Sequence, residues 1–260
     1  PILMKQPEKP NDRDNKVRFI VSAACPSDLW EKFEKRYGLT IYEAYGAVDG
    51  GGKLILNIGT APVGSIGKPP LKVKYRLVDD KMNDVPDDTP GELIFATSKG
   101  NGKGGSVEYF RNESASTEKS DGNWIFTGDL MKRDGKGFLY FIGRNTESMR
   151  IKGENVSAFE VEQTIQKHPD IVEAAVYAVP SELAEDEIMA SVTVVEGRSV
   201  KEKDILEFIK EDLPKFAVPR YIKIVDEFQK TETFRIKKKE IESLGVVRGT
   251  YDDSIGSYIQ

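Results

Sequence analysis

Apolar and polar positions near the start of the chain alternate in blocks that predict a strand, a helix and a second strand. Residues 17–24 form an apolar run typical of a buried strand, and Ser27 then begins a helix that Gly38 ends. Residues 41–45 form the second apolar run. Because a helix joins them, the two strands are expected to be parallel, with the loops that follow them at one edge of the sheet. Open α/β sheets bind ligands at that edge.

The middle of the chain, from about residue 53 to residue 142, has a different pattern. Short apolar segments at residues 72–78, 92–96 and 138–142 are separated by Gly, Pro, Asn and Asp, which predicts a small antiparallel β subdomain. The segment TSKGNGKGG at residues 97–105 is superficially like a phosphate-binding loop. It lacks the G-x-x-x-x-G-K-[ST] spacing and a following helix, so we interpret it as a flexible hairpin loop.

The last third of the chain predicts a self-contained α+β domain. The patterns Ser157-x-x-Glu160 and Ser199-x-x-Glu202 are capping boxes that each begin a helix. With the strands, they give the order βαββαβ, a two-layer sandwich, and a domain boundary near Gly143. The strands are expected at residues 149–152, 171–179, 188–195 and 221–225.

Composition narrows the possible classes of protein. The 260 residues are 38% hydrophobic and 31% charged, which suits a globular protein with more than one folding unit. There is no apolar stretch of transmembrane length and no signal-peptide pattern, so a cytoplasmic location is expected. Cys25 is the single cysteine and His168 the single histidine, which excludes an internal disulfide and a Cys/His zinc site.

The charge balance does not favour binding to nucleic acid. Lys and Arg total 38 against 43 Asp and Glu, a formal net charge of -5. The one basic run, residues 237–239, is followed by Glu240 and Glu242. We interpret it as a solvated helix face in preference to a phosphate-binding patch.

Three polar clusters could carry chemistry, and each has a structural explanation when taken alone. Asp129 in Thr127-Gly128-Asp129 could accept hydrogen bonds from both hydroxyls of a ribose, although a turn-capping aspartate explains the tripeptide as well. Tyr45-Gly46 followed by Asp49 offers an aromatic face for a base and a hard oxygen ligand for magnesium. The third cluster joins Gly143-Arg144 to the charged residues 150–155 at the predicted boundary, where hinges form.

The order of these motifs resembles the AMP-forming acyl-CoA synthetases of the adenylating superfamily over nearly the whole chain. The motifs are SAACP, YGAVD, GEL, TGDL after an aromatic-rich stretch, GRNTES, RIKGENVSAFEVE and LPKFAVP, with a basic C-terminal segment. Within the family, KGENVS resembles the carnitine-CoA ligases and the fatty-acid-transport type of very-long-chain synthetases.

This resemblance implies a fold and a domain organisation. The fold class is α/β plus α+β: the end of a large α/β nucleotide-binding domain with a β subdomain, followed by a small βαββαβ two-layer domain. The expected parts are residues 1–142 of the large domain, including the β subdomain at 53–142, a hinge at 143–147, a small mobile domain at 148–245 and a tail at 246–260. An N-terminal half of the same polypeptide, with a phosphate-gripping loop, is expected upstream.

The implied activity is that of an ATP-dependent ligase, which activates a carboxylic acid as acyl-AMP and transfers it to coenzyme A. A fatty acid is the favoured substrate, and ATP or AMP, Mg²⁺ and coenzyme A are the expected cofactors. The expected partners are small molecules, with no nucleic acid. The resemblance also implies roles for particular residues: adenine enclosed by Ala23, Ala24, Tyr45 and Gly46; ribose held by Asp129 and Arg144; magnesium bound by Asp49; a hinge at Thr146; a pantetheine channel lined by Lys152, Gly153, Glu154 and Asn155; and catalytic cations at Arg235, Lys237 and Lys152.

Departures from the family pattern leave a second class open. Val48-Asp49 stands where the family has Thr-Glu, and Arg235 stands where it has a lysine. Both favour a non-catalytic adenylate-binding homologue or partner module, whereas Asp129, Arg144 and the KGEN loop favour the enzyme. A peptide-synthetase adenylation domain or a luciferase would share the fold and ranks lower.

Overall fold

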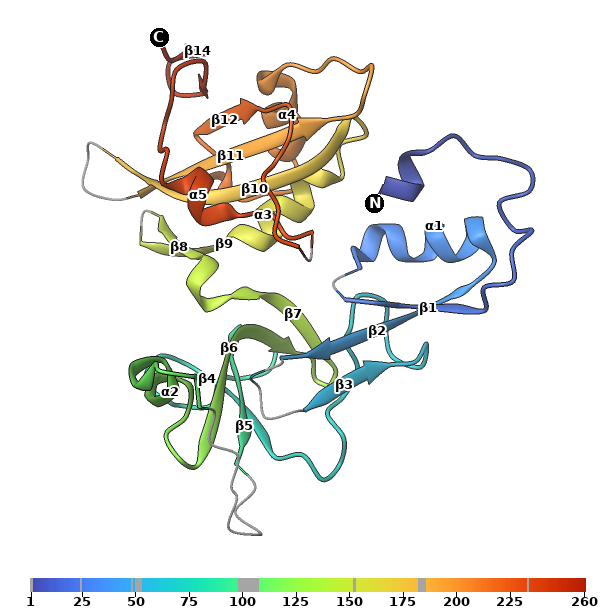
Figure 1. The fold of residues 1–260 in the computed structure, drawn as a ribbon, viewed down its shortest axis with the longest axis vertical. Coiled ribbons are helices and arrows are strands. Elements are labelled where there is room, and N and C mark those ends of the chain that lie inside the picture. The colour runs from blue at the N-terminus through green and yellow to red at the C-terminus, as the bar shows by residue number, and fades with distance from the viewer. Residues whose placement is uncertain are drawn as a thin grey trace. The chain divides into compact units, whose positions relative to one another are not determined.

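The computed structural model of the chain divides into two compact units, Leu3–Asn145 and Thr146–Gln260. The structure describes residues 2–23, 25–47, 49, 53–97, 108–151, 153–181, 186–232 and 234–260. The division falls within residues 143–147, the segment for which the sequence predicts a hinge. Each unit is coloured by position along the chain in Figure 1 and has its own core.

The first unit begins with the short 3-10 helix Ile2–Lys5 and a three-stranded sheet in the order β1-β2-β3. Strand β1 (Phe19–Ser22) and strand β2 (Thr40–Gly46) are parallel, and helix α1 (Ser27–Tyr37) connects them. This confirms the predicted strand-helix-strand unit. Gly38 ends α1, and its N–H donates to the carbonyl of Glu34. Strand β3 (Leu54–Asn57) then pairs antiparallel to β2 (Figure 1).

The prediction that residues 17–24 form a buried strand is wrong in one respect, because one face of β1 is open. Phe19 is 44% exposed and Val21 is 62% exposed. Leu54 and Leu56 of β3 are exposed on the same face of the sheet, since the register places them beside Gly46 and Ala44 of β2. The core of the unit covers only the opposite face. Strand β1 therefore has the apolar pattern of a strand buried on both faces but is buried on one face only.

A four-stranded antiparallel sheet in the order β4-β5-β6-β7 forms the rest of the first unit. Three of its strands lie close to the predicted segments, and the fourth, β6, is a strand that was not predicted. Only Thr97 of the predicted hairpin loop at 97–105 lies within the described residues. Helix α2 (Glu113–Lys119) precedes β6, and the Asn112 side chain caps it by accepting from the N–H of Ala115. The strands are β4 (Tyr75–Val78), β5 (Gly91–Ala96), β6 (Trp124–Arg133) and β7 (Leu139–Arg144).

The two sheets of the first unit share one core, which gathers the inward side chains of β2 to β7. This shared core brings the carboxyl end of β2 beside β5 and β6. Its buried members are Tyr45, Ile55, Ile66, Leu77, Leu93, Phe95, Met131 and Leu139.

The second unit is a five-stranded sheet with helices on it and a separate two-stranded hairpin (Figure 1). Strands β10 and β11 are antiparallel, and β11 and β12 are parallel. The elements are the 3-10 helix Asn145–Glu147, β8 (Ser148–Ile151), β9 (Glu154–Ser157), α3 (Ala158–Gln166), β10 (Ile171–Pro180), β11 (Asp186–Val194), α4 (Glu202–Ile209), the 3-10 helix Lys215–Ala217, β12 (Tyr221–Ile224), α5 (Lys238–Glu242), β13 (Tyr251–Asp252) and β14 (Ser257–Tyr258).

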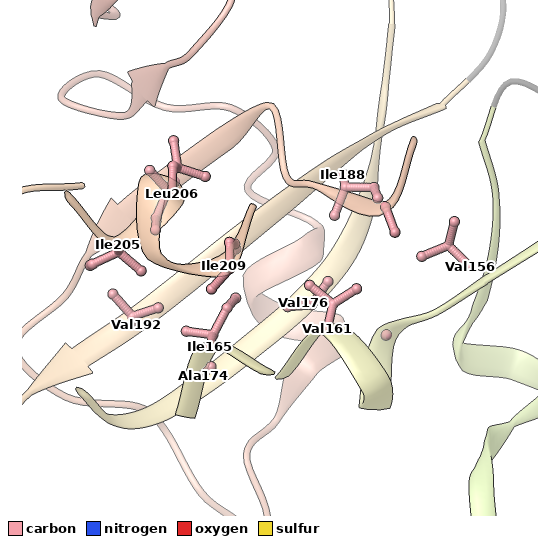
Figure 2. Close-up of a cluster of buried hydrophobic side chains, with 14 of the residues drawn as sticks. Val156, Val161, Ile165, Ala174, Val176, Ile188, Val192, Ile205, Leu206 and Ile209 are labelled. Carbon is pink, nitrogen blue, oxygen red and sulfur yellow. The ribbon is translucent and has the colours of Figure 1, made fainter. Parts of the chain in front are cut away.

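Helices α3 and α4 cover one face of this sheet. Their apolar side chains, including Ile165 and Ile209, lie close to those of β10 and β11, including Val176 and Val192 (Figure 2). Ile241 of α5 packs against a smaller buried cluster on other positions of the same strands. The alternation of side chains along a strand places those positions on the opposite face.

The serine of the first predicted capping box is the N-cap of its helix at the expected position. Ser157 caps α3, and its hydroxyl accepts from the N–H of Glu160 at 3.3 Å. The second prediction is wrong: Lys201 is the N-cap residue of α4 and makes no side-chain capping bond. Glu202 instead accepts from the hydroxyl of Tyr258 at 2.7 Å, which ties α4 to the C-terminal hairpin.

The predicted βαββαβ order is found as β8, α3, β10, β11, α4 and β12. Strand β8 pairs with β9 instead of joining the main sheet. The expected tail at 246–260 also differs, because β13 pairs with β12 and β14 pairs with β13. Strands of two residues are too short to show a period, which is why the sequence pattern does not reveal them. Among the described residues, no helix is long and apolar enough to span a membrane.

The C-terminal hairpin should therefore contribute to the stability of the second unit. Tyr251 is 6% exposed and belongs to the main core. We expect Tyr251→Ala to lower the free energy of unfolding by about 3 kcal/mol, because it removes a buried aromatic ring. Tyr251→Phe keeps the ring and should change it by less than about 1 kcal/mol. Denaturant unfolding followed by circular dichroism measures both, and equal midpoints for the two variants would contradict this packing.

Candidate functional site

The carboxylate of Asp129 lies at the centre of a polar cluster in the first unit. Asp129 pairs in register with Arg144 across β6 and β7, and a register shift follows between Leu130 and Met131. Gly128, just before it, has φ 75°, a backbone conformation that glycine adopts without a steric penalty. The glycine and the irregular pairing together turn this short segment out of a regular ladder.

Three side chains fix the orientation of Asp129. The hydroxyl of Tyr45 donates to its Oδ2 at 2.7 Å, and Nε of Arg144 lies 3.5 Å from its Oδ1. The hydroxyl of Thr127 accepts from the Asp129 N–H at 3.1 Å and donates to the carbonyl of Leu93 at 2.6 Å. The Asp129 side chain is only 9% exposed. The Asp129 carboxylate is thus a largely desolvated acceptor with one neutral partner, Tyr45, and one cationic partner, Arg144.

The environment changes the proton affinity of both central groups. Burial raises the pKa of Asp129, and the hydrogen bond from Tyr45 and the charge of Arg144 offset only part of that rise. Burial and the neighbouring carboxylate also raise the pKa of Tyr45, so its hydroxyl remains a donor. A desolvated carboxylate held in this way can form strong hydrogen bonds to neutral hydroxyl groups.

Glu92 supports the Asp129 segment from the neighbouring strand. It accepts from the N–H of Gly128 at 2.9 Å and from the side chain of Asn145 at 3.2 Å. Burial is the main reason why the pKa of Glu92 is raised. The sequence marks Glu92 only as part of the GEL motif, and nothing in the spacing shows that it holds the TGD turn.

The predicted adenine loop follows β1. Ala23 is within the described part of the chain and Ala24 is outside it. The N–H of Cys25 donates to Oε2 of Glu43, a buried residue of β2, at 3.2 Å. Burial, and next the charge of Glu43, raise the pKa of the Cys25 thiol to about 11, so it is a poor nucleophile near neutral pH. Glu43 is a supporting residue that the alternating pattern of β2 places inward but does not identify.

The expected magnesium ligand, Asp49, has partners from its own chain. Nζ of Lys119 lies 3.2 Å from its Oδ2, and the hydroxyl of Tyr109 donates to the same oxygen. Burial would raise the pKa of Asp49, but the bonds from Tyr109 and Lys119 bring it below its ordinary value. The hydrogen bond to Asp49 raises the pKa of Tyr109 to about 12.

This arrangement does not fit a preformed magnesium site. Magnesium requires several oxygen ligands in near-octahedral geometry and usually keeps several waters. The described residues contain no group of three or more His, Cys, Asp or Glu side chains that could hold a metal ion. Asp49 offers one carboxylate already paired with a lysine, and Val48 lies outside the described residues.

The predicted pantetheine residues form the β8–β9 hairpin of the second unit. Glu154 and Asn155 begin β9, and Nη1 of Arg150 donates to the Asn155 side chain at 3.1 Å. Gly153 occupies the turn with φ 84°. Lys152 lies outside the described residues. Thr146, the predicted hinge residue, is exposed and is the first residue of the segment Thr146–Gln260 that forms the second unit.

Arg235 lies on a tight exposed turn of the second unit. The turn closes through a hydrogen bond between the N–H of Thr231 and the carbonyl of Arg235 at 2.8 Å. Phe234, just before Arg235, has φ 60° and an exposed side chain. Within the described part of the chain Arg235 forms no ion pair, whereas Lys237 pairs with Glu240 at 3.0 Å.

Lys238, in contrast, is held inside the second unit by two carboxylates. Its Nζ lies 2.6 Å from Glu147 and 2.8 Å from Glu162, and Glu162 also accepts from the N–H of Val176 at 2.7 Å. Burial would lower the pKa of Lys238, but the two carboxylates raise it above its ordinary value. Burial raises the pKa of Glu162 despite the nearby ammonium group. These contacts give Lys238 a structural role.

Of the residues predicted for the site, the structure brings Tyr45, Asp129 and Arg144 together in the first unit. Arg235, Lys237 and the β8–β9 hairpin belong to the second unit. Glu43, Glu92, Tyr109 and Lys119 are supporting residues that the sequence analysis did not identify.

Comparison with known families finds two matches along the chain. The model of the AMP-binding enzymes matches residues 2–104, and the model of the AMP-binding enzyme C-terminal domain matches residues 160–235. The two matches follow one another along the chain in the order of its two units. The chain therefore belongs to the adenylate-forming AMP-binding enzymes.

Individual relatives are acyl-CoA ligases. Steroid-22-oyl-CoA synthetase of Rhodococcus jostii is 32% identical, and the match covers 92% of this chain and 45% of that protein. The medium/long-chain-fatty-acid–CoA ligase FadD17 of Mycobacterium marinum is 31% identical, over 94% of this chain and 48% of that protein. Crotonobetaine/carnitine–CoA ligase of Proteus mirabilis is 30% identical, over 92% and 47%. The chain thus spans about half the length of the curated relatives it matches.

Solved structures agree with the fold. The anthranilate CoA ligase AuaEII in complex with anthranoyl-AMP is 28% identical, with a TM-score of 0.77 over 88% of this chain and 44% of that one. The o-succinylbenzoate CoA synthetase of Bacillus subtilis, bound to its acyl-adenylate intermediate, is 22% identical, with a TM-score of 0.75 over 93% and 48%. The second match shows the fold alone.

The ion pairs of Lys238 lead to a stability prediction. Lys238→Met should lower the free energy of unfolding by about 3 kcal/mol, because it leaves Glu162 and Glu147 without their counter-charge. Lys237→Met, next to it, removes only an exposed pair and should change stability by less than about 0.5 kcal/mol. Thermal or denaturant unfolding of the two variants decides between them. A loss in Lys237→Met as large as that in Lys238→Met would contradict the structural role.

Proposed function

We propose that the complete protein is an ATP-dependent, AMP-forming acid–CoA ligase, with a fatty acid as the favoured substrate. The observation that carries the proposal is the Tyr45–Asp129–Arg144 cluster, found in a chain that matches both domains of the AMP-binding enzymes. In the first step a substrate carboxylate attacks the α-phosphate of ATP, which gives acyl-AMP and pyrophosphate. In the second step the thiol of coenzyme A displaces AMP, which gives the acyl thioester.

The cluster in the first unit would hold the nucleoside. Asp129 has two carboxylate oxygens that can accept hydrogen bonds from the two hydroxyls of a ribose. Arg144, whose side chain is half exposed, can then turn toward the same sugar while keeping Asp129 ionised. The ring of Tyr45 packs in the core beside this point, and its hydroxyl keeps one oxygen of Asp129 in place. Together with the loop at Ala23 and Ala24, these groups bind and orient the adenosine but do not react.

The second unit would supply the remaining groups. Arg235, on its exposed turn, is a cation for the phosphate and carboxylate of the first step, with Lys237 close to it in sequence. Gly153, Glu154 and Asn155 of the β8–β9 hairpin, together with Lys152 beside them in the sequence, would line the path of the pantetheine arm in the second step. A rotation at Thr146 would exchange these two faces, as hinged domains do in many enzymes. Magnesium would enter bound to the phosphates of ATP, whose charge it neutralises.

The open face of the β1–β2–β3 sheet supports a partner within the same polypeptide. Phe19 stacks on Tyr42 with ring centroids 4.8 Å apart, and Val21, Leu54 and Leu56 extend the exposed apolar face beside them. The relatives are about twice as long as this chain. We infer that the N-terminal half of such a polypeptide covers this face, since apolar patches of this kind are rarely left open.

The test of the proposal is ATP–pyrophosphate exchange by the complete protein with carboxylic acids of increasing chain length. Exchange that depends on one class of acid supports a ligase and identifies the substrate. Binding of AMP without exchange for any acid would instead favour the non-catalytic homologue that Val48 and Arg235 leave open.

Asp129→Ala should weaken the binding of AMP strongly. A hydrogen bond to a charged group contributes about 1.5 to 3 kcal/mol, so the loss of the ribose acceptor predicts an affinity reduced by tenfold or more. Asp84→Ala, which removes an exposed carboxylate of the same unit, should leave AMP affinity unchanged. Isothermal titration calorimetry of the complete protein measures both. Equal affinities in wild type and Asp129→Ala would return Asp129 to the role of a turn residue.

Arg235→Lys should speed adenylation and leave thioester formation from supplied acyl-AMP unchanged. A guanidinium group is planar and bulky, so it grips phosphate oxygens in a fork and crowds an in-line carboxylate, whereas an ammonium group is compact. We expect a gain of about tenfold, which corresponds to ~1.4 kcal/mol of barrier. Rapid-quench assays of each half-reaction give the two rates. If Arg235→Lys does not change adenylation but Lys237→Ala abolishes it, the role belongs to Lys237.

A further inference from the structure

Lys119 holds a position that neither its sequence context nor its helix explains. It is the last residue of α2, a helix of seven residues with no buried side chain. The Lys119 side chain is nevertheless only 17% exposed, because it extends toward β6 and the segment after β2. A lysine that keeps its ammonium group away from solvent needs compensating partners.

Two partners come from separate parts of the first unit. Nζ of Lys119 donates to the carbonyl of Thr127 at 3.0 Å and lies 3.2 Å from Oδ2 of Asp49. Thr127 comes two residues before Asp129 in the chain. One ammonium group therefore links the segment that holds Asp49 to the strand that holds the central carboxylate of the site. Two of its three donors are used in this link, which leaves one for another acceptor.

The charges around Lys119 show what it contributes. The polar cluster contains the carboxylates of Asp49, Glu92 and Asp129, and the cations Lys119 and Arg144. The charge of Lys119 lowers the proton affinity of each of these carboxylates. Without Lys119 the cluster would hold three acids against one cation, a field that repels an anionic ligand.

We propose that Lys119 is a positioning residue of the nucleotide site, which supplies fixed positive charge for the phosphates and uses Asp49 as its anchor. This inference rests on the proposed function, and it assigns Asp49 a role other than that of a magnesium ligand. The contacts carry the argument: Oδ2 of Asp49 accepts from the hydroxyl of Tyr109 and lies 3.2 Å from Nζ of Lys119. Tyr109 and Lys119 thus share one carboxylate oxygen, which fixes the lysine and its anchor together.

The first experiment compares ligands that differ only in phosphate. Adenosine, AMP and ATP are titrated calorimetrically into the complete wild-type protein and into Lys119→Met, Lys119→Arg and the exposed control Lys136→Met. Lys119→Met should lose about tenfold or more in ATP affinity, less in AMP affinity and less than about threefold in adenosine affinity. Lys119→Arg should restore most of the loss, and Lys136→Met should behave as wild type.

A role limited to stabilising the end of α2 would give a different result. It would lower the melting temperature of Lys119→Met but affect the three ligands equally, and that outcome would overturn the inference. Wild-type binding with unchanged ATP affinity in Lys119→Met would also overturn it while leaving the proposed function intact. Failure of the wild-type protein to bind any of the three ligands would overturn the proposed function and the inference with it.

The second experiment tests the role of Asp49. If Asp49 anchors Lys119, Asp49→Asn and Lys119→Met should each reduce ATP affinity, and the double variant should be no worse than either one. The dependence of ATP affinity on magnesium concentration should be the same in Asp49→Asn as in wild type. Additive losses, or a magnesium dependence abolished by Asp49→Asn alone, would restore Asp49 as a metal ligand. If Lys119→Met does not fold, Asp49→Asn/Lys119→Gln leaves no charge unpaired and permits the same comparison of ATP with adenosine.

Discussion

The hydrogen bond between Tyr45 and Asp129 is the constraint on which the first unit depends. It joins β2 of one sheet to β6 of the other, within a core that both sheets share. A largely buried carboxylate is unfavourable unless donors or cations compensate it, so the fold must bring Tyr45 and Arg144 to the same point. The register shifts in β5 and β6 and the left-handed Gly128 lie in the strand segments around that point. The same hydrogen bond therefore orients Asp129 and links the two sheets.

The second unit also contains a charged side chain held away from solvent by partners, but there the central group is a cation. There a partly buried ammonium group, Lys238, lies between Glu147 and the buried Glu162. Glu147 lies near the start of the unit, Glu162 belongs to α3 and Lys238 begins α5, so three distant parts of the chain meet at one charge. Buried ion pairs of this kind contribute little net stability but strongly disfavour arrangements in which a partner is missing. In each unit, a charged side chain held by partners from separate parts of the chain helps to select the packing.

Elements whose hydrophobic pattern extends over several residues were predicted from the sequence. Elements and contacts that depend on tertiary structure were not. The strand-helix-strand opening, the cap at Ser157 and the strands β10 to β12 all have patterns that extend over several residues. Strands β13 and β14 are too short to have a period. The hydrogen bond from Tyr258 to Glu202, the first residue of α4, is a tertiary contact that no local pattern records. For the candidate site, the motifs named Asp129, Arg144 and Tyr45, whose side chains the structure brings together. Glu43, Glu92 and Lys119 are ordinary charged residues in the sequence, and only the folded chain shows that they hold the loops around them.

The backbone at Phe234 has a consequence for engineering this protein. A bulky residue with positive φ is strained by about 1 kcal/mol, and glycine would occupy the same conformation freely. A redesign directed at thermostability would therefore replace Phe234 among its first choices. The replacement would also loosen the tip that presents the Arg235 guanidinium group, because glycine has access to many more backbone conformations. At this turn, variants ranked by melting temperature would fall in a different order from variants ranked by how firmly they hold the Arg235 side chain.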